Sequence, residues 1–197
     1  MRGRFLAFEG GEATGKTTQA RLLAEQLGAV LTREPGGTEV GERVRDLVLD
    51  PAVRVDFRAE ALLMAAARAQ HVTEVIEPAL AAGRHVVTDR FTASSLAYQG
   101  VGRGLGVDQV AALSAFATGG LAPDLVLLLD VPLDVTAARL SEQPDRLELE
   151  GAPFHARVAA AFRQLAAADT QRWVVVPAGG SVDEVAARVW DTVHSRL

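Results

Sequence analysis

The sequence predicts an α/β fold in which a doubly wound parallel sheet of five strands is flanked by helices. Short apolar runs of strand length alternate along the chain with segments of helical periodicity, and this alternation is typical of parallel sheets. No repeat, low-complexity tract or linker divides the 197 residues. A chain of this length and continuity is expected to form a single domain that spans residues 1–197.

The predicted strands are short apolar or β-branched runs that are bounded by turn residues. They comprise residues 4–9, 30–33, 85–89, 125–130 and 172–176. Because helical segments separate consecutive strands, the strands are expected to run parallel, and ligands are expected at their carboxyl ends.

The predicted helices carry apolar residues at helical spacing. They comprise residues 16–27, 38–49, 57–82, 92–97, 107–118, 133–140, 154–168 and 182–196. Gly83 is expected to cap the C-terminus of the longest one, 57–82.

Composition excludes several classes of function. The chain contains no cysteine, which excludes disulfides, thiolate metal sites and cysteine nucleophiles. The formal net charge of −5 argues against a nucleic-acid partner or an anionic membrane surface. No apolar run approaches the length of a signal-sequence core or a membrane span, so a cytoplasmic protein is expected.

A glycine-rich motif follows the first predicted strand and opens the first predicted helix. Its residues fit the pattern G-x-x-x-x-G-K-[ST], and they are Gly10, Gly11, Glu12, Ala13, Thr14, Gly15, Lys16 and Thr17. Glycines let the backbone N–H groups turn toward a phosphate, and the helix N-terminus adds positive potential. Lys16 is expected to reach the β- and γ-phosphates and Thr17 to bind Mg²⁺. The motif therefore predicts a nucleoside triphosphate site and the P-loop NTPase type of fold.

Lysine usage supports this assignment. Lysine and arginine together number 20, and Lys16 is the single lysine, which leaves 19 arginines. A compact ammonium charge is thus kept at the one position where a P-loop requires it. GTPases recognise guanine with an N-K-x-D loop, which requires a second lysine. Because the chain has no second lysine, the sequence argues against a GTPase.

Two further predicted strands end in charged residues. Arg33 ends the second strand, and Asp89 ends the third and is followed by Arg90. Arginine forks suit bidentate phosphate binding, so these two arginines opposite a P-loop suggest a second anionic ligand. Asp89 stands where a carboxylate usually holds Mg²⁺ through water. The alternative is that the arginines are solvated surface residues and that Asp89 caps a helix.

Three motifs carry a resemblance to a known family. They are residues 8–18, residues 33–38 with the sequence Arg-Glu-Pro-Gly-Gly-Thr, and residues 86–100 around Asp-Arg-Phe. With these motifs the chain resembles thymidylate kinases over nearly its whole length. The resemblance implies an enzyme that transfers a phosphoryl group from ATP to dTMP with Mg²⁺ and forms a homodimer. It also adds Thr18 to the ATP-binding residues.

The resemblance implies roles for individual residues in an acceptor site. Glu12 would accept a hydrogen bond from the 3′-hydroxyl, Arg33 and Arg90 would bind the acceptor phosphate, and Arg68 would donate to a thymine oxygen. Either Ser94 or Ser95 would face the thymine edge. The full set of implied dTMP-binding residues is Glu12, Arg33, Met64, Arg68, Arg90, Ser94, Ser95, Tyr98 and Gln99.

Two members of this set concern selectivity. Tyr98 would crowd the 2′ side of the sugar and favour deoxyribose. Met64 stands where the family usually has a phenylalanine that stacks on thymine. A thioether can cover an aromatic face, but stacking is expected to weaken.

The polar stretch 141–152 resembles the short mobile lid of the family. P-loop positions 11–14 contain no arginine, and relatives with that pattern place a catalytic arginine in the lid, where this chain has Arg146. Relatives often carry several lid arginines, whereas this stretch contains one. Arg139 would pack on the adenine of ATP. The implied catalytic residues are Lys16, Asp89, Arg90 and Arg146.

Two alternatives stay open. The chain could be another nucleoside-monophosphate kinase or a deoxynucleoside kinase, although Glu12, Arg33 and Arg90 favour a nucleotide acceptor over a nucleoside. It could also be an ATP-binding scaffold that regulates a partner without turnover.

Overall fold

The computed structural model describes residues 1–132 and 144–196. Its centre is one parallel sheet with the strand order β2-β3-β1-β4-β5. The strands are β1 (Phe5–Glu9), β2 (Val30–Arg33), β3 (Val86–Asp89), β4 (Leu125–Asp130) and β5 (Trp173–Pro177). The predicted fold class and all five predicted strands are confirmed, with ends shifted by a residue at most.

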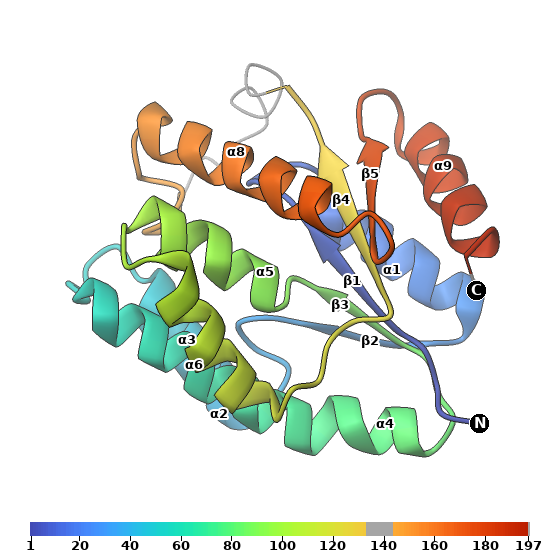
Figure 1. Ribbon diagram of the computed structural model, residues 1–197, viewed down its shortest axis with the longest axis horizontal. Helices are drawn as coiled ribbons and strands as arrows, with labels where there is room; N and C mark the ends of the chain where they lie inside the picture. Colours follow the sequence, from blue (N-terminus) through green and yellow to red (C-terminus); the bar gives the residue numbers. More distant parts are fainter. Residues whose placement is uncertain (133–143, 197) are drawn as a thin grey trace.

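Helices cover both faces of this sheet (Figure 1). In chain order they are α1 (Lys16–Leu27), α2 (Glu39–Leu49), α3 (Phe57–His71), η1 (Val72–Ile76), α4 (Glu77–Ala81), α5 (Thr92–Ser95), η2 (Leu96–Gly102), α6 (Val107–Thr118), α8 (Ala152–Ala168) and α9 (Val182–His194). The predicted helix at 133–140 and the first lid residues, 141–143, lie outside the described residues. Among the described helices, none is long and apolar enough to cross a membrane.

The core follows from the alternation of side chains along buried strands. In β1, Leu6 and Phe8 point to the face covered by α1 and α9, where they join one apolar cluster. Phe5 and Ala7 point to the opposite face and pack with η1 and α4. All four side chains are fully buried. Both faces of this central strand are covered, so these four side chains are all apolar and form one continuous run. This run made the strand predictable from the sequence.

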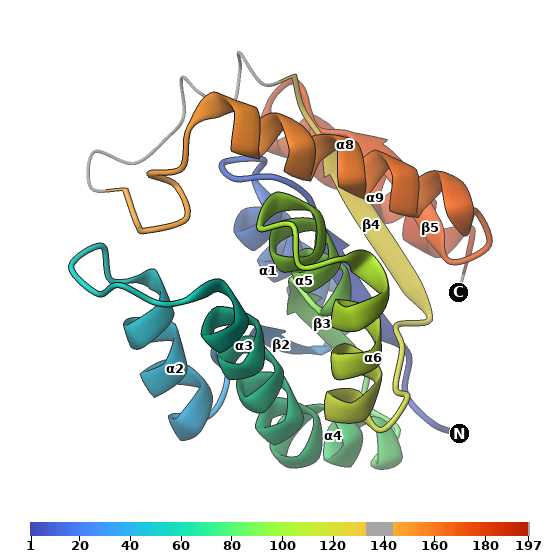
Figure 2. The ribbon, with the colours of Figure 1, turned by 60° about the vertical axis from the view of Figure 1, so that its left-hand side comes forward.

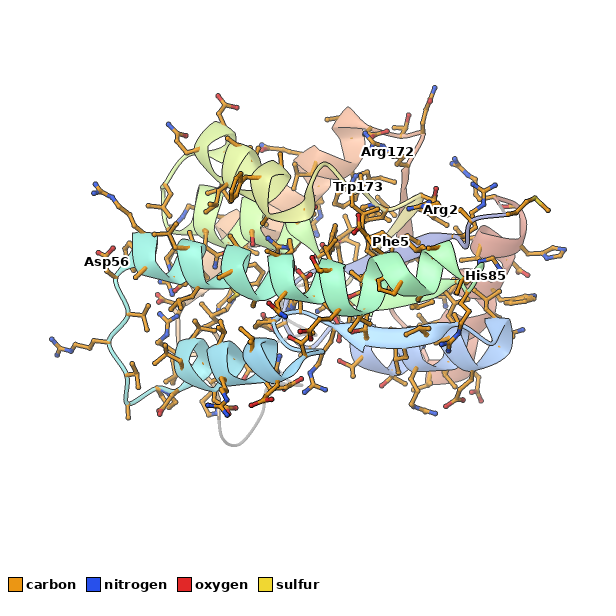
Figure 3. All side chains as sticks on the ribbon, turned by 90° about the horizontal axis from the view of Figure 1, so that it is seen from below. Arg2, Phe5, Asp56, His85, Arg172 and Trp173 are labelled. Carbon is orange, nitrogen blue, oxygen red and sulfur yellow. The ribbon has the colours of Figure 1, made fainter. Side chains whose placement is uncertain are left out.

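The long helix predicted over 57–82 is confirmed as three joined segments, α3, η1 and α4, and Figure 3 shows it running from Asp56 toward His85. Its first turn is capped by the Asp56 side chain, which accepts from the Arg58 amide at 2.9 Å. The middle segment η1 is a π-helix. Pro78 follows that segment and has no N–H to donate to the carbonyl of Glu74, so a wider turn there avoids a clash with its ring.

The helix predicted to end at residue 97 continues instead through Gly102 as η2. Glycine usually signals a helix end, but here it permits close packing. A Cβ on Gly102 would lie 2.7 Å from the ring of Phe154 in α8. Gly102 thus lets η2 and α8 approach each other, and it is the last residue of η2.

Strand register aligns the ends that carry charged residues. Phe8 and Arg33 each pair with Asp89 on β3, and Glu9 pairs with Leu128 on β4. The carboxyl ends of β1, β2 and β3 therefore lie at one edge of the sheet, where α1 begins. This edge is where parallel sheets place their ligands.

Candidate active site

The loop of residues 10–15 curls because several of its residues adopt a left-handed conformation. Gly10 and Gly15 have φ angles of 144° and 89°, and Ala13 has a φ of 54°. A Cβ on Gly10 would lie 2.7 Å from the carbonyl oxygen of Leu129, so a side chain is excluded there. The loop leads directly into α1 at Lys16. This is the geometry of an anion-binding loop at a helix N-terminus.

Lys16 is buried beneath this loop, with 5% of its surface exposed. Its ammonium group donates to the Gly11 carbonyl and, at 3.3 Å, to the Thr14 hydroxyl. Burial, aided by the nearby Arg90 and opposed by Glu12, lowers the pKa of Lys16 to about 8. An anionic phosphate beside this ammonium would favour its charged form.

Thr17 and Asp89 meet at the start of α1. The Thr17 hydroxyl donates to Oδ2 of Asp89 at 2.5 Å. The other carboxylate oxygen, Oδ1, is buried and has no hydrogen-bond partner among the described residues. A hydroxyl and a carboxylate with a spare oxygen fit Mg²⁺, which prefers oxygen ligands and retains several waters.

Arg90 spans the space between the loop and η2. It adopts a φ of 71°, and its guanidinium donates to the Gly10 carbonyl at 2.9 Å and to Glu12 at 2.7 Å. It also lies 5.1 Å from the ring centroid of Tyr98. Burial alone would lower the pKa of Arg90, but Glu12 and other anions raise it well above its usual range. Arg90 is therefore a permanent cation at this site.

Glu12 is an anion inside a phosphate loop, and its neighbours explain how it is tolerated. It accepts from Arg90 and, at 2.5 Å, from the Tyr98 hydroxyl. Burial would raise the pKa of Glu12, but Arg90 and Lys16 outweigh it and lower the pKa to about 2. Glu12 thus remains a charged acceptor at neutral pH, and its charge is balanced by cations.

A pocket opens beside this loop and gathers most of the predicted acceptor residues. It is lined by Glu12, Glu34, Pro35, Arg45, Leu49, Met64, Arg68, Arg90, Phe91, Ser94, Ser95, Tyr98, Gln99, Asp145 and Leu147. We call it the acceptor pocket. Of the predicted set only Arg33 does not line it.

Arg68 is held in the wall of the acceptor pocket by three partners, of which only Ser95 was singled out from the sequence. Its Nε donates to Glu34 at 2.7 Å, and its Nη2 donates to the Phe91 carbonyl and to Ser95. Its third nitrogen, Nη1, is buried without a hydrogen-bond partner among the described residues. A buried orphan donor in a pocket wall is available to a ligand oxygen.

Ser94 and Ser95 have different partners. Ser95 accepts from Arg68. The hydroxyl of Ser94 donates to the buried carboxyl group of Glu9 at 2.6 Å, and the same carboxyl group accepts from the amides of Phe91 and Ser94. Burial raises the pKa of Glu9 to about 7, although Ser94 and Arg90 favour the charged form. Glu9 was also missed, because a glutamate that ends a strand looks like a solvated residue.

The predicted phosphate residue Arg33 is half-exposed and pairs with Glu42 at 2.8 Å. It borders an open cleft around the P-loop that is also lined by Thr14, Lys16, Thr17, Thr18 and Asp89. Arg45, which sequence reasoning missed, borders both this cleft and the acceptor pocket. In sequence it is one of several arginines on an amphipathic helix, and no local signal distinguishes it.

Arg146 lies away from the P-loop and lines neither the acceptor pocket nor the cleft. Its guanidinium donates to Glu60 at 2.7 Å and to the Val48 carbonyl at 2.8 Å. Arg139, the predicted adenine contact, lies outside the described residues.

Comparison with known proteins agrees with this geometry. The family model described as thymidylate kinase matches residues 8–189. A thymidylate kinase of Synechococcus sp. (strain JA-3-3Ab) is 54% identical, covering 98% of this chain and 96% of the relative. Those of Deinococcus radiodurans and Lactobacillus helveticus are 47% and 43% identical, covering 98% and 100% of this chain and 98% of each relative. With its P-loop and adjoining acceptor pocket, the chain belongs to the thymidylate kinase family.

Proposed function

We propose that the protein transfers the γ-phosphoryl group of Mg·ATP to dTMP, giving dTDP and ADP for dTTP synthesis in the cytoplasm. One observation carries the proposal: the P-loop cleft and the acceptor pocket share Glu12 and Arg90. A donor phosphate on the loop and an acceptor phosphate in the pocket would therefore meet at Arg90, with Arg45 as a second cation that borders both. Phosphoryl transfer requires this juxtaposition.

The catalytic contribution of the chain is positioning and charge. The acceptor phosphate oxygen attacks directly, so no side chain needs to act as a nucleophile. Lys16 and Arg90 neutralise charge that spreads over the transferring group. Mg²⁺, when bound, adds a further positive charge there, and Thr17 and Asp89 are the residues that would hold it, Asp89 through water. Arg146 is proposed as a further cation, which requires its release from Glu60.

The acceptor pocket supplies recognition of the nucleotide. Nη1 of Arg68 would donate to a ring oxygen of thymine, Met64 would cover the base and Tyr98 would exclude a 2′-hydroxyl. Glu12 would accept from the 3′-hydroxyl. The remaining contacts are proposed for Arg33, Ser94, Ser95 and Gln99 around the acceptor and for Arg139 on the adenine of ATP.

The function is tested by ADP release with Mg·ATP and each nucleoside monophosphate in turn. A strong preference for dTMP is expected. Turnover with another monophosphate, or with a deoxynucleoside, would keep the P-loop assignment and reassign the acceptor. Tight ATP binding without acceptor-dependent turnover would support a regulatory scaffold instead.

Replacing Arg68 by alanine is expected to raise KM for dTMP by roughly tenfold to a hundredfold, which corresponds to a lost charged hydrogen bond of about 1.5–3 kcal/mol. KM for ATP should change little, because Arg68 lies in the acceptor pocket. Steady-state kinetics with each substrate varied separately measures both values. The matched control is Arg172→Ala, which removes an exposed arginine paired with Asp169. Equal effects on both KM values would remove Arg68 from base recognition.

ATP binding is expected to weaken as the pH rises through 8. The pKa of Lys16 in the free protein is about 8, and bound phosphate would hold Lys16 in its charged form. Above pH 8 the free protein must therefore take up a proton in order to bind, and the dissociation constant should rise roughly tenfold between pH 7.5 and pH 9. Titration calorimetry in buffers of different ionisation enthalpy measures both the affinity and the proton uptake. An affinity independent of pH would show that Lys16 keeps its proton throughout this range.

A homodimer is proposed because three neighbouring helices expose large apolar side chains. Helices α2, α3 and α6 lie side by side (Figure 2), and Leu47, Leu62 and Phe116 are 41%, 58% and 88% exposed. Apolar side chains gathered on one face are typical of an interface. Phe116→Arg is expected to give a monomer in sedimentation analysis. Val182→Arg, at an exposed apolar site on α9, should leave the assembly unchanged, and a wild-type monomer would refute the proposal.

A further inference from the structure

Glu60 is a fully buried carboxylate on α3 that lines neither the acceptor pocket nor the P-loop cleft. One of its oxygens accepts from the Gln99 amide at 2.7 Å, and the other accepts from Arg146 at 2.7 Å and from Arg103 at 3.3 Å. A buried charge is tolerated only when it is fully paired. Glu60 meets this condition by joining three segments that are far apart in the sequence.

Arg103 extends this group of ion pairs. It is itself buried, pairs also with Glu150, and lies between the rings of Phe57 and Phe154 at 4.7 and 4.8 Å from their centroids. The group therefore contains two carboxylates, Glu60 and Glu150, and two guanidinium groups, from Arg103 and Arg146. Its formal charges cancel, and removing any one of them leaves a buried charge uncompensated.

Both arginines connect Glu60 to the segment 144–150, which precedes α8 and lies near the end of α2 in Figure 2. Arg146 also donates through its side chain to the Val48 carbonyl and through its amide to the Leu49 carbonyl, at 2.8 and 2.9 Å. Arg103 holds the end of the segment through Glu150. The segment is thus attached to α2, α3 and the end of η2.

The same segment forms part of the acceptor pocket. Asp145 and Leu147, the neighbours of Arg146 on each side, line the pocket together with Gln99 and Met64. Leu147 is 7% exposed and packs in the apolar cluster that contains Met64 and Tyr98. The position of this wall therefore depends on the contacts of Arg146, although Arg146 does not line the pocket.

We propose that Glu60 is a positioning residue for acceptor binding, because it anchors segment 144–150 through Arg146 and Arg103 as one wall of the acceptor pocket. Its main effect is expected on the acceptor, since neither Glu60 nor its two arginines border the P-loop cleft, which segment 144–150 reaches only through Glu148. The inference deepens the proposed function by assigning a residue that shapes the acceptor site without touching the acceptor.

The test is Glu60→Gln, which keeps the size of the side chain but removes the charge and presents an amide N–H group to the arginines. KM for dTMP should rise roughly tenfold or more, while KM for ATP stays within about twofold of wild type. The control is Asp124→Asn, which removes a carboxylate paired with Arg2 and Arg4 at the opposite edge of the sheet. This control should lower the melting temperature and leave both KM values unchanged.

Hydrogen exchange gives a readout that does not depend on turnover. The amides of Arg146 and Leu149 donate to Leu49 and Asp145 in the folded chain, so they should exchange faster in Glu60→Gln, while α9 exchanges as in wild type. If the single variant fails to fold, Glu60→Gln with Arg103→Gln removes one charge of each sign and keeps the group neutral. The same split between the two KM values is expected of it.

The outcomes separate the two proposals. If wild type uses a monophosphate other than dTMP, the proposed substrate is wrong, and the same comparison is made with that acceptor. A folded Glu60 variant whose acceptor KM and whose exchange at 144–150 match wild type would overturn the role of Glu60. Equal changes in both KM values would also overturn it, because they would indicate a general loss of structure.

Discussion

Replacing Lys16 by alanine is expected to lower kcat about a thousandfold or more, equivalent to about 4 kcal/mol of transition-state stabilisation. The ammonium group is buried beneath the phosphate loop, within reach of the Gly11 carbonyl and the Thr14 hydroxyl. No other lysine exists in the chain to replace it. Initial rates of ADP release at saturating ATP and dTMP measure the effect.

The melting temperature of Lys16→Ala and the kcat of a second variant on the same helix serve as controls for this prediction. Lys16 has a lowered pKa because burial penalises its charge, so its removal should not unfold the protein, and the melting temperature should stay close to wild type. Glu25→Ala changes an exposed residue of the same helix, which pairs with Arg21, and should leave kcat unchanged. Retention of even a tenth of the wild-type kcat by Lys16→Ala would contradict the assignment of the P-loop as the donor site.

Replacing Arg90 by alanine is expected to lower kcat roughly a hundredfold to a thousandfold and to raise KM for dTMP as well. Arg90 borders both the P-loop cleft and the acceptor pocket, as Arg45 does, and it is the one that also contacts the P-loop. Its loss would also leave Glu12 without the cation that does most to keep its pKa near 2. The Glu12 carboxylate in the loop would then repel the incoming phosphates, because its charge would be less well neutralised.

The variant Arg90→Lys separates charge from geometry. Lysine restores one positive charge but cannot donate at once to Gly10, Ser94 and Glu12, as the fork of Arg90 does. We expect Arg90→Lys to recover less than a tenth of wild-type kcat while remaining more active than Arg90→Ala. Full activity of Arg90→Ala, measured as ADP release over a range of dTMP concentrations, would show that the acceptor phosphate is neutralised elsewhere.

Local patterns were sufficient for the sheet and the donor loop. β1 and β4 are continuous apolar runs because both faces of the sheet are covered, and the P-loop motif is a contiguous stretch whose conformation depends on its own glycines. Helix ends were less predictable. The helix predicted to end at residue 97 extends to Gly102, where the absence of a side chain admits the ring of Phe154 from α8.

In the acceptor site, the partners of the predicted residues could not be predicted from the sequence. The end of the third strand predicted Arg90 and resemblance added Arg68, but no role was predicted for Glu34, which orients Arg68, or for Arg45, which borders both clefts. Arg33 was predicted to bind the acceptor phosphate and Arg146 to act in catalysis. In the structure each is paired with a glutamate, Arg33 with Glu42 at the surface and Arg146 with Glu60 in the interior.

The sequence by itself determined the fold class, the P-loop with its single lysine and most of the residues that line the acceptor pocket. The fold class and the P-loop rest on short-range patterns of apolar spacing and glycine placement, whereas most of the acceptor residues came from the resemblance to a known family. Only the tertiary structure decided which ions pair with which, because a carboxylate such as Glu60 finds its partners 43 and 86 residues away. Those partners, and the desolvation that sets the pKa values of Lys16 and Glu12, exist only once the chain has folded.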